Sequence, residues 1–68
     1  MIILHVNILL KQDADINAVK EIVKSYKKAK LDELNYAVYF NDEFRIAQDF
    51  ISELHPFTYA SRIIKETF

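Results

Sequence analysis

The sequence predicts a small two-layer α/β domain with helices packed on one face of a β-sheet, and an α+β arrangement is the alternative. Apolar residues alternate with a period of two in residues 2–10 and 34–40, as half-buried strands require. They recur with helical spacing in residues 15–30 and 41–55. The resulting order of strand, helix, strand and helix is typical of layered α/β folds.

The composition limits both the size and the chemistry of the protein. A chain of 68 residues is expected to form a single compact domain, residues 1–68, with little core to stabilise it. It contains no cysteine, which excludes disulfides and thiolate zinc sites. It also contains no glycine, which excludes the glycine-rich phosphate and dinucleotide loops. Stability must therefore come from a dense apolar core or from a partner chain.

The first strand is expected to have two different faces. One face is wholly apolar, and the other, made of Ile3, His5, Asn7 and Leu9, is half polar. This pattern is typical of a strand with one side in a core and the other only partly covered. The segment is about half as long as a membrane span and lacks the basic residues of an export signal. We therefore expect a cytoplasmic protein without a membrane segment.

The helix over residues 15–30 is the best-marked element of the chain. Asp13 or Asp15 can accept hydrogen bonds from its first N–H groups. One apolar stripe runs along it, formed by Ile16, Val19, Ile22, Val23, Tyr26 and Ala29.

The second strand and second helix follow directly. The second helix is expected to begin at Asn41 or Asp42 and to end before Pro56. Because short connections flank the first helix, a right-handed crossover should make the two strands parallel. In a glycine-free chain, turn positions with positive φ should fall to Asn35, Asn41 or Asp13.

The C-terminal segment, residues 57–68, fits two structures. As a helix it begins favourably at Pro56 and has an apolar stripe, and this is the preferred prediction. As a third strand, Phe57, Tyr59 and Ile63 would alternate with more polar positions. Two strands alone make a poor sheet, so a helical C-terminus would make dimerisation more necessary.

A basic face is predicted on the first helix, formed by Lys20, Lys24, Lys27 and Lys28. Lysines near a helix C-terminus are favoured by the helix dipole, which accounts for the later ones. Lys20, Lys24 and Lys28 are spaced four residues apart, so neighbouring lysines in this series repel each other. An acidic group nearby would offset this repulsion, and the spacing therefore indicates an acidic neighbour. That neighbour can be internal, because residues 32–56 hold six acids against one arginine, whereas residues 1–31 hold six lysines against three acids.

A second candidate surface lies on the other face of the sheet. Tyr39 should point away from the core, beside Ile3, His5 and Leu9. A mixture of aromatic, aliphatic and histidine side chains resembles a protein interface more than a bare exterior. The alternative is a single-sided sheet with a few exposed apolar residues.

No catalytic, metal or cofactor motif is found. The two histidines, His5 and His55, are fifty residues apart, and no third ligand stands at metal-binding spacing. The paired acids at Asp32–Glu33 and Asp42–Glu43 are adjacent residues, which do not converge on one substrate. We therefore expect no enzyme, no cofactor and no small-molecule ligand.

The expected function is a small protein-binding module, regulator or inhibitor that self-associates as a homodimer. The alternative is a weak nucleic-acid-binding regulator that uses the lysine face. The near-neutral net charge of −1 and the presence of only two arginines, both distant from the lysines, argue against that alternative.

Overall fold

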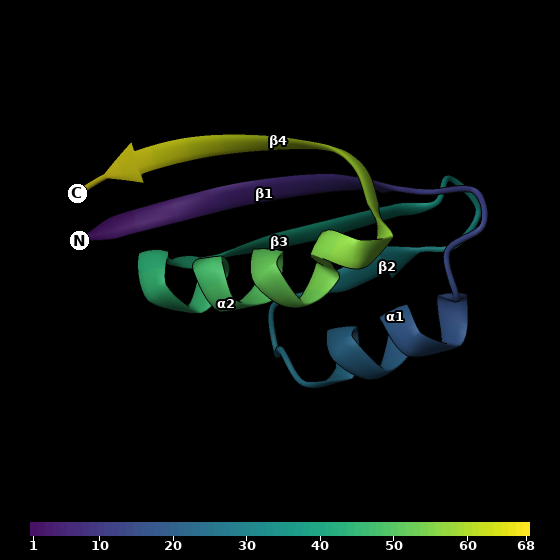
Figure 1. Cartoon of the computed structure of the whole chain (residues 1–68). Coiled ribbons are helices and arrows are strands. Elements are labelled where there is room, and N and C mark those ends of the chain that lie inside the picture. Colours follow the sequence, from purple (N-terminus) through teal and green to yellow (C-terminus); the bar gives the residue numbers. More distant parts are fainter.

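The computed structural model describes all 68 residues and shows a small α+β domain. The elements, in chain order, are β1 (Ile2–Leu10), α1 (Ile16–Lys24), β2 (Lys30–Asp32), β3 (Ala37–Glu43), α2 (Phe44–Leu54), a 3₁₀ turn (His55–Phe57) and β4 (Thr58–Thr67). The four strands form one antiparallel sheet in the order β2-β3-β1-β4. Both helices lie on the same side of this sheet (Figure 1).

This order is the split βαβ arrangement of ferredoxin-like domains. Each helix connects two strands that run in the same direction, and a third strand is inserted between them. Thus β3 lies between β1 and β2, and β1 lies between β3 and β4. The two chain ends meet at one side of the sheet, where the Met1 amino group donates to the Phe68 carbonyl oxygen at 2.9 Å.

The predicted parallel pairing of the first two strands is wrong. The strand expected over residues 34–40 is β3, which runs antiparallel to β1. The short strand β2 begins at Lys30, the last residue of the expected first helix, and continues into the connection that was expected before residue 34. Because β2 and β3 form a hairpin, the chain reverses direction before it pairs with β1.

The preferred helix over residues 57–68 is also wrong, because this segment forms β4. Its register pairs Ile64 with His5 and Ile63 with Val6, with one irregularity near Leu9. A strand here satisfies the backbone groups along the whole length of β1, which would otherwise be exposed at a sheet edge. The β-branched and aromatic residues of the segment, Thr58, Tyr59, Ile63, Ile64 and Thr67, favour a strand and were outweighed by the helical spacing.

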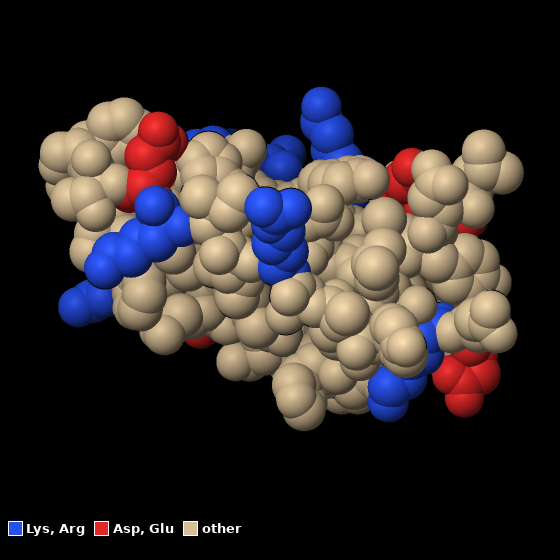
Figure 2. Space-filling model, turned by 90° about the horizontal axis from the view of Figure 1, so that it is seen from above, with Lys and Arg blue, Asp and Glu red and all other residues tan.

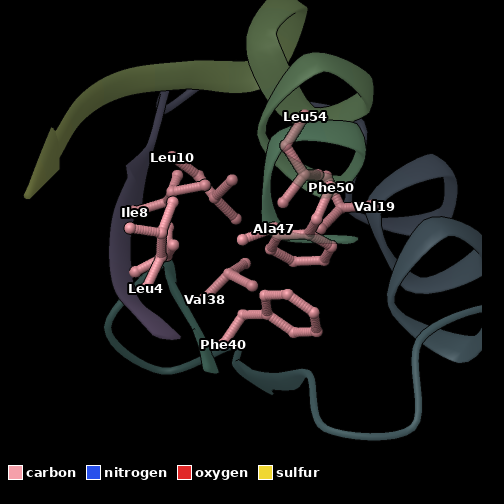
Figure 3. Close-up of a cluster of buried hydrophobic side chains, with 10 residues drawn as sticks. Leu4, Ile8, Leu10, Val19, Val38, Phe40, Ala47, Phe50 and Leu54 are labelled. Atoms are coloured by element: carbon pink, nitrogen blue, oxygen red, sulfur yellow. The ribbon is translucent and has the colours of Figure 1, made fainter. Parts of the chain in front are cut away.

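One apolar core lies between the sheet and the helices (Figure 3). The even-numbered residues of β1 point into it, as their alternation predicts. The other buried members come from α1, β3 and α2, namely Val19, Val38, Phe40, Ala47, Phe50 and Leu54. The apolar stripe predicted for the first helix packs against this core, although the helix is shorter than expected.

Helix α1 ends at Lys24 rather than Lys30. Asp15 caps its start, accepting from the backbone N–H of Asn17 at 3.0 Å and of Ala18 at 3.3 Å. The chain then turns so that Tyr26 and Ala29 still reach the core outside the helix. Because both side chains are partly buried, the sequence keeps the apolar spacing of a helix up to residue 29, although the helix itself ends at Lys24.

The only residue with positive φ is Tyr36, at 50°, and none of the expected Asn or Asp residues adopts this conformation. Tyr36 ends the turn that joins β2 to β3. Asp32 organises this turn by accepting from the Asn35 backbone N–H at 3.2 Å and from its side-chain amide at 2.8 Å. These two bonds, the side-chain one foremost, lower the pKa of the Asp32 carboxyl. The asparagine thus stabilises the turn through its side chain, and its neighbour takes the left-handed position.

Three aromatic rings fill the space between β3, α2 and the end of α1. Phe40 stacks on Phe50 with centroids 4.4 Å apart, and Tyr26 meets both rings edge-on. The Tyr26 hydroxyl donates to the Glu53 carboxylate. Burial, followed by this bond and the negative charges of Glu53 and Asp49, raises the pKa of Tyr26 to about 12.

Tyr26→Phe should lower the free energy of unfolding by about 0.5–1.5 kcal/mol at neutral pH, through loss of one hydrogen bond. The folded pKa lies above the ordinary value of 10.0, so the wild-type advantage is present below pH 10 and is lost as pH rises toward 12. Urea unfolding across this range should therefore show the two stabilities converging. Tyr59→Phe is the control, because this exposed hydroxyl has no hydrogen-bond partner, and it should change stability by less than about 0.5 kcal/mol. A constant gap between Tyr26→Phe and wild type would contradict the assignment.

Candidate protein-binding face

The side of the sheet opposite the helices is uncovered, and we call it the open face. Its exposed and half-exposed side chains alternate with core-facing residues along β1, β2 and β3, whereas β4 has no buried residue and contributes by register alone. They are Ile3, His5, Asn7 and Leu9 of β1, Lys30 and Asp32 of β2, Tyr39, Asn41 and Glu43 of β3, and Ala60, Arg62, Ile64 and Glu66 of β4. Figure 2 views the molecule from the β4 side of the sheet and shows that uncharged atoms make up most of the surface seen from there.

The apolar members of the open face are large and accessible. Leu9 is 47% exposed, Tyr39 is 43% exposed and Ile64 is 52% exposed. They come from three neighbouring strands, and the register places Asn7 and His5 of β1 opposite Tyr39 and Ile64. A surface of this kind, with a few polar groups, is what protein interfaces present.

A shallow hollow lies in the middle of this face. It is lined by His5, Val6, Asn7, Tyr39, Phe40, Asn41, Arg62 and Ile64. The His5 Nε2 atom lies 2.9 Å from the Glu66 Oε1 atom across the β1–β4 pair. Arg62 is on the same strand as Glu66 and forms no ion pair within the chain. Its guanidinium is therefore an unpaired cation in the lining of the hollow.

The four residues predicted for the interface lie together on the open face. Asn7 of β1 pairs with Tyr39 of β3, and Ile3, His5 and Leu9 occupy the alternate positions along β1. The sequence prediction missed Arg62, Ile64 and Glu66 because it placed residues 57–68 in a helix. Strand alternation in the same segment would have assigned all three to one face.

The four lysines of the predicted basic face do not share one helix face. Lys20 and Lys24 belong to α1, whereas Lys27 and Lys28 follow its C-terminus. Three of the four have acidic neighbours within the chain: Lys20 lies 3.0 Å from Glu33, Lys24 lies 3.8 Å from Glu21, and Lys28 lies 3.7 Å from Asp42. These acidic neighbours are thus internal, and they come from the β2–β3 turn, α1 and β3.

The open face has no excess of positive charge. Its cations, Lys30 and Arg62, are outnumbered by three carboxylates, those of Asp32, Glu43 and Glu66. A nucleic-acid-binding surface requires an excess of positive charge to neutralise phosphates. The open face therefore lacks the excess of positive charge that binding to a phosphate backbone requires.

Other kinds of site are not evident. No group of three or more His, Asp or Glu side chains is placed to hold a metal ion. Asp32–Glu33 lies at the β2–β3 turn and Asp42–Glu43 at the end of β3, and His55 lies in the 3₁₀ turn far along the chain from His5. Neither helix has the length and apolar character needed to cross a bilayer.

No known protein family matches the chain, and no curated protein or solved structure is significantly similar to it.

Proposed function

We propose that this protein is a non-enzymatic protein-binding module that self-associates and binds its partner through the open face. The observation that carries the proposal is the exposure of Leu9, Tyr39 and Ile64 on three adjacent strands. A domain of 68 residues has little apolar material to spare. Leaving large side chains uncovered on a whole sheet face is therefore best explained by a surface that becomes buried on binding.

The four lysines of the predicted basic face give weaker support to the alternative function, nucleic-acid binding. Ion pairs with Glu33, Glu21 and Asp42 already occupy three of its four lysines. These pairs are exposed, so each contributes little to stability, but each also reduces the positive potential presented to a phosphate. A regulatory or inhibitory role for the module is part of the proposal, and the small size of the chain is compatible with it.

A photoreactive phenylalanine analogue at position 39 tests the binding face. In an extract of the source cells, it should form a protease-sensitive, nuclease-resistant adduct upon irradiation. The matched control carries the same group at position 34, because Leu34 is 91% exposed in the β2–β3 turn outside the sheet ladder. An adduct at position 39 that nuclease removes, equal adducts at both positions, or no adduct at position 39 would contradict the proposal.

A further inference from the structure

The outer edge of β4 is the longest free strand edge in the protein. β4 has ten residues and pairs only with β1, whereas the opposite edge strand, β2, has three. Natural proteins protect sheet edges by making them short or by covering them, because unpaired N–H and C=O groups are a template for another strand. β2 is protected by its length, whereas β4 is neither short nor covered and carries only the charges of Arg62, Lys65 and Glu66.

The hydrogen bonds at the chain ends show which β4 residues present free backbone groups. Met1 and Phe68 exchange two bonds, N–H of Phe68 to O of Met1 at 2.8 Å and the reverse at 2.9 Å. In an antiparallel pair, hydrogen-bonded positions alternate with non-hydrogen-bonded ones. Ile64 is four residues before Phe68, so its backbone groups also bond to β1, whereas those of Ile63 and Lys65 point away from β1. The backbone groups that point away from β1 are therefore those of Ser61, Ile63, Lys65 and Thr67.

The side chains of β4 discriminate between the ways in which two copies could pair. In a two-fold antiparallel pair, the residue on the symmetry axis lies opposite its own copy. An axis at Arg62 therefore places two arginines opposite each other, and an axis at Lys65 places two lysines opposite each other. Centring on Ile63 places Arg62 opposite an isoleucine. Centring on Ile64 places Arg62 opposite the partner's Glu66 on the open face, and this happens twice by symmetry. Opposite charges stabilise such cross-strand pairs and like charges destabilise them.

We propose that two copies of the chain pair through β4, antiparallel, with Ile64 opposite the partner's Ile64. The pair supplies a countercharge for Arg62, which, like Lys30 at the far edge of the open face, lacks an ion pair within its own chain. It satisfies the free backbone groups from Ser61 to Thr67, which no other element covers. It also joins the two sheets into one sheet of twice the width, so that the two open faces form one surface. This inference rests on the self-association proposed above and specifies its geometry.

Disulfide formation by single-cysteine variants tests the register. The chain has no cysteine of its own, so any disulfide reports on the introduced residue. Ile64 and the partner's Ile64 form a non-hydrogen-bonded pair with Cα atoms about 4.5 Å apart, which is within disulfide range. Ile64→Cys should therefore form a covalent dimer rapidly on mild oxidation. Ile63→Cys is the control, because its Cα would lie more than about 7 Å from its symmetry mate.

A charge exchange tests the ion pairs. Arg62→Glu should raise the dissociation constant of the dimer roughly tenfold, because two attractive pairs become repulsive. The double variant Arg62→Glu with Glu66→Arg should recover affinity in sedimentation experiments. A double variant as weak as the single one would overturn the proposed register.

A proline variant tests the edge itself. Lys65→Pro removes an N–H that β1 does not use, so the circular dichroism spectrum should stay that of the wild type while the dimer is lost. A folded Lys65→Pro protein that remains dimeric would overturn pairing through β4. A wild-type dimer with no disulfide at position 64 would overturn the edge geometry and leave self-association intact, whereas a strictly monomeric wild type would overturn both.

Discussion

Replacing Phe50 by alanine should lower the free energy of unfolding by about 3–5 kcal/mol. Phe50 is fully buried, stacks on Phe40 and meets Tyr26 edge-on, so its removal leaves a cavity and breaks both aromatic pairs. A chain of 68 residues has a total stability of roughly 3–10 kcal/mol, at about 0.05–0.15 kcal/mol per residue. The loss is therefore a large part of the total, and urea denaturation followed by circular dichroism should show a markedly lower midpoint or an unfolded chain.

Phe44→Ala provides the matched control in the same helix. Phe44 is 40% exposed at the first position of α2, so truncating it removes less buried area and should cost less than about 2 kcal/mol. Equal losses for the two variants would mean that Phe50 is not the centre of the core.

Replacing Ile8 by aspartate should unfold the protein at neutral pH, whereas Leu9→Asp should leave it folded. Ile8 is completely buried in the middle of β1, where a carboxylate would have no partner, and the penalty for such a group is several kcal/mol. Leu9 is the adjacent residue, but its side chain is on the open face and is 47% exposed. Thermal unfolding of the two variants would measure the difference directly.

The pair also separates stability from binding. A folded Leu9→Asp protein should bind its partner through the open face with lower affinity, because a charge replaces one of the largest apolar side chains of that face. If Ile8→Asp folded as well as Leu9→Asp, the assignment of the two faces of β1 would be wrong, and with it the candidate site.

The helices and the predicted interface show how far local patterns reach. The apolar spacing of α1 identified residues that contact the core, because helical periodicity reflects which side is buried. The spacing of α2 did the same, except that it also included Phe44, which is 40% exposed. Alternation along β1 likewise placed Ile3, His5 and Leu9 on one face, and Tyr39 joined them through the β1–β3 register. These predictions needed only the local geometry of one element at a time.

The lysines show where a local pattern misleads. Their spacing suggested one basic helix face, but α1 ends at Lys24 because the chain must turn to form β2. Lys28 lies beside Asp42, which is fourteen residues away in sequence. The two residues meet because the segment that follows α1 packs near the end of β3. Ion pairs between distant residues leave no periodic signal in a sequence.

By itself, the sequence determined the two-layer class, the single core, the two amphipathic helices and the two faces of β1. It did so because burial imposes a period of two on strands and of 3.6 on helices, whatever the rest of the chain does. The tertiary structure alone decided that residues 58–67 form a strand, that β3 separates β1 from β2, and that Arg62 and Ile64 complete the open face. Strand formation depends on hydrogen bonds to a distant partner, and here the unpaired side of β1 outweighed the helical spacing of the C-terminal segment.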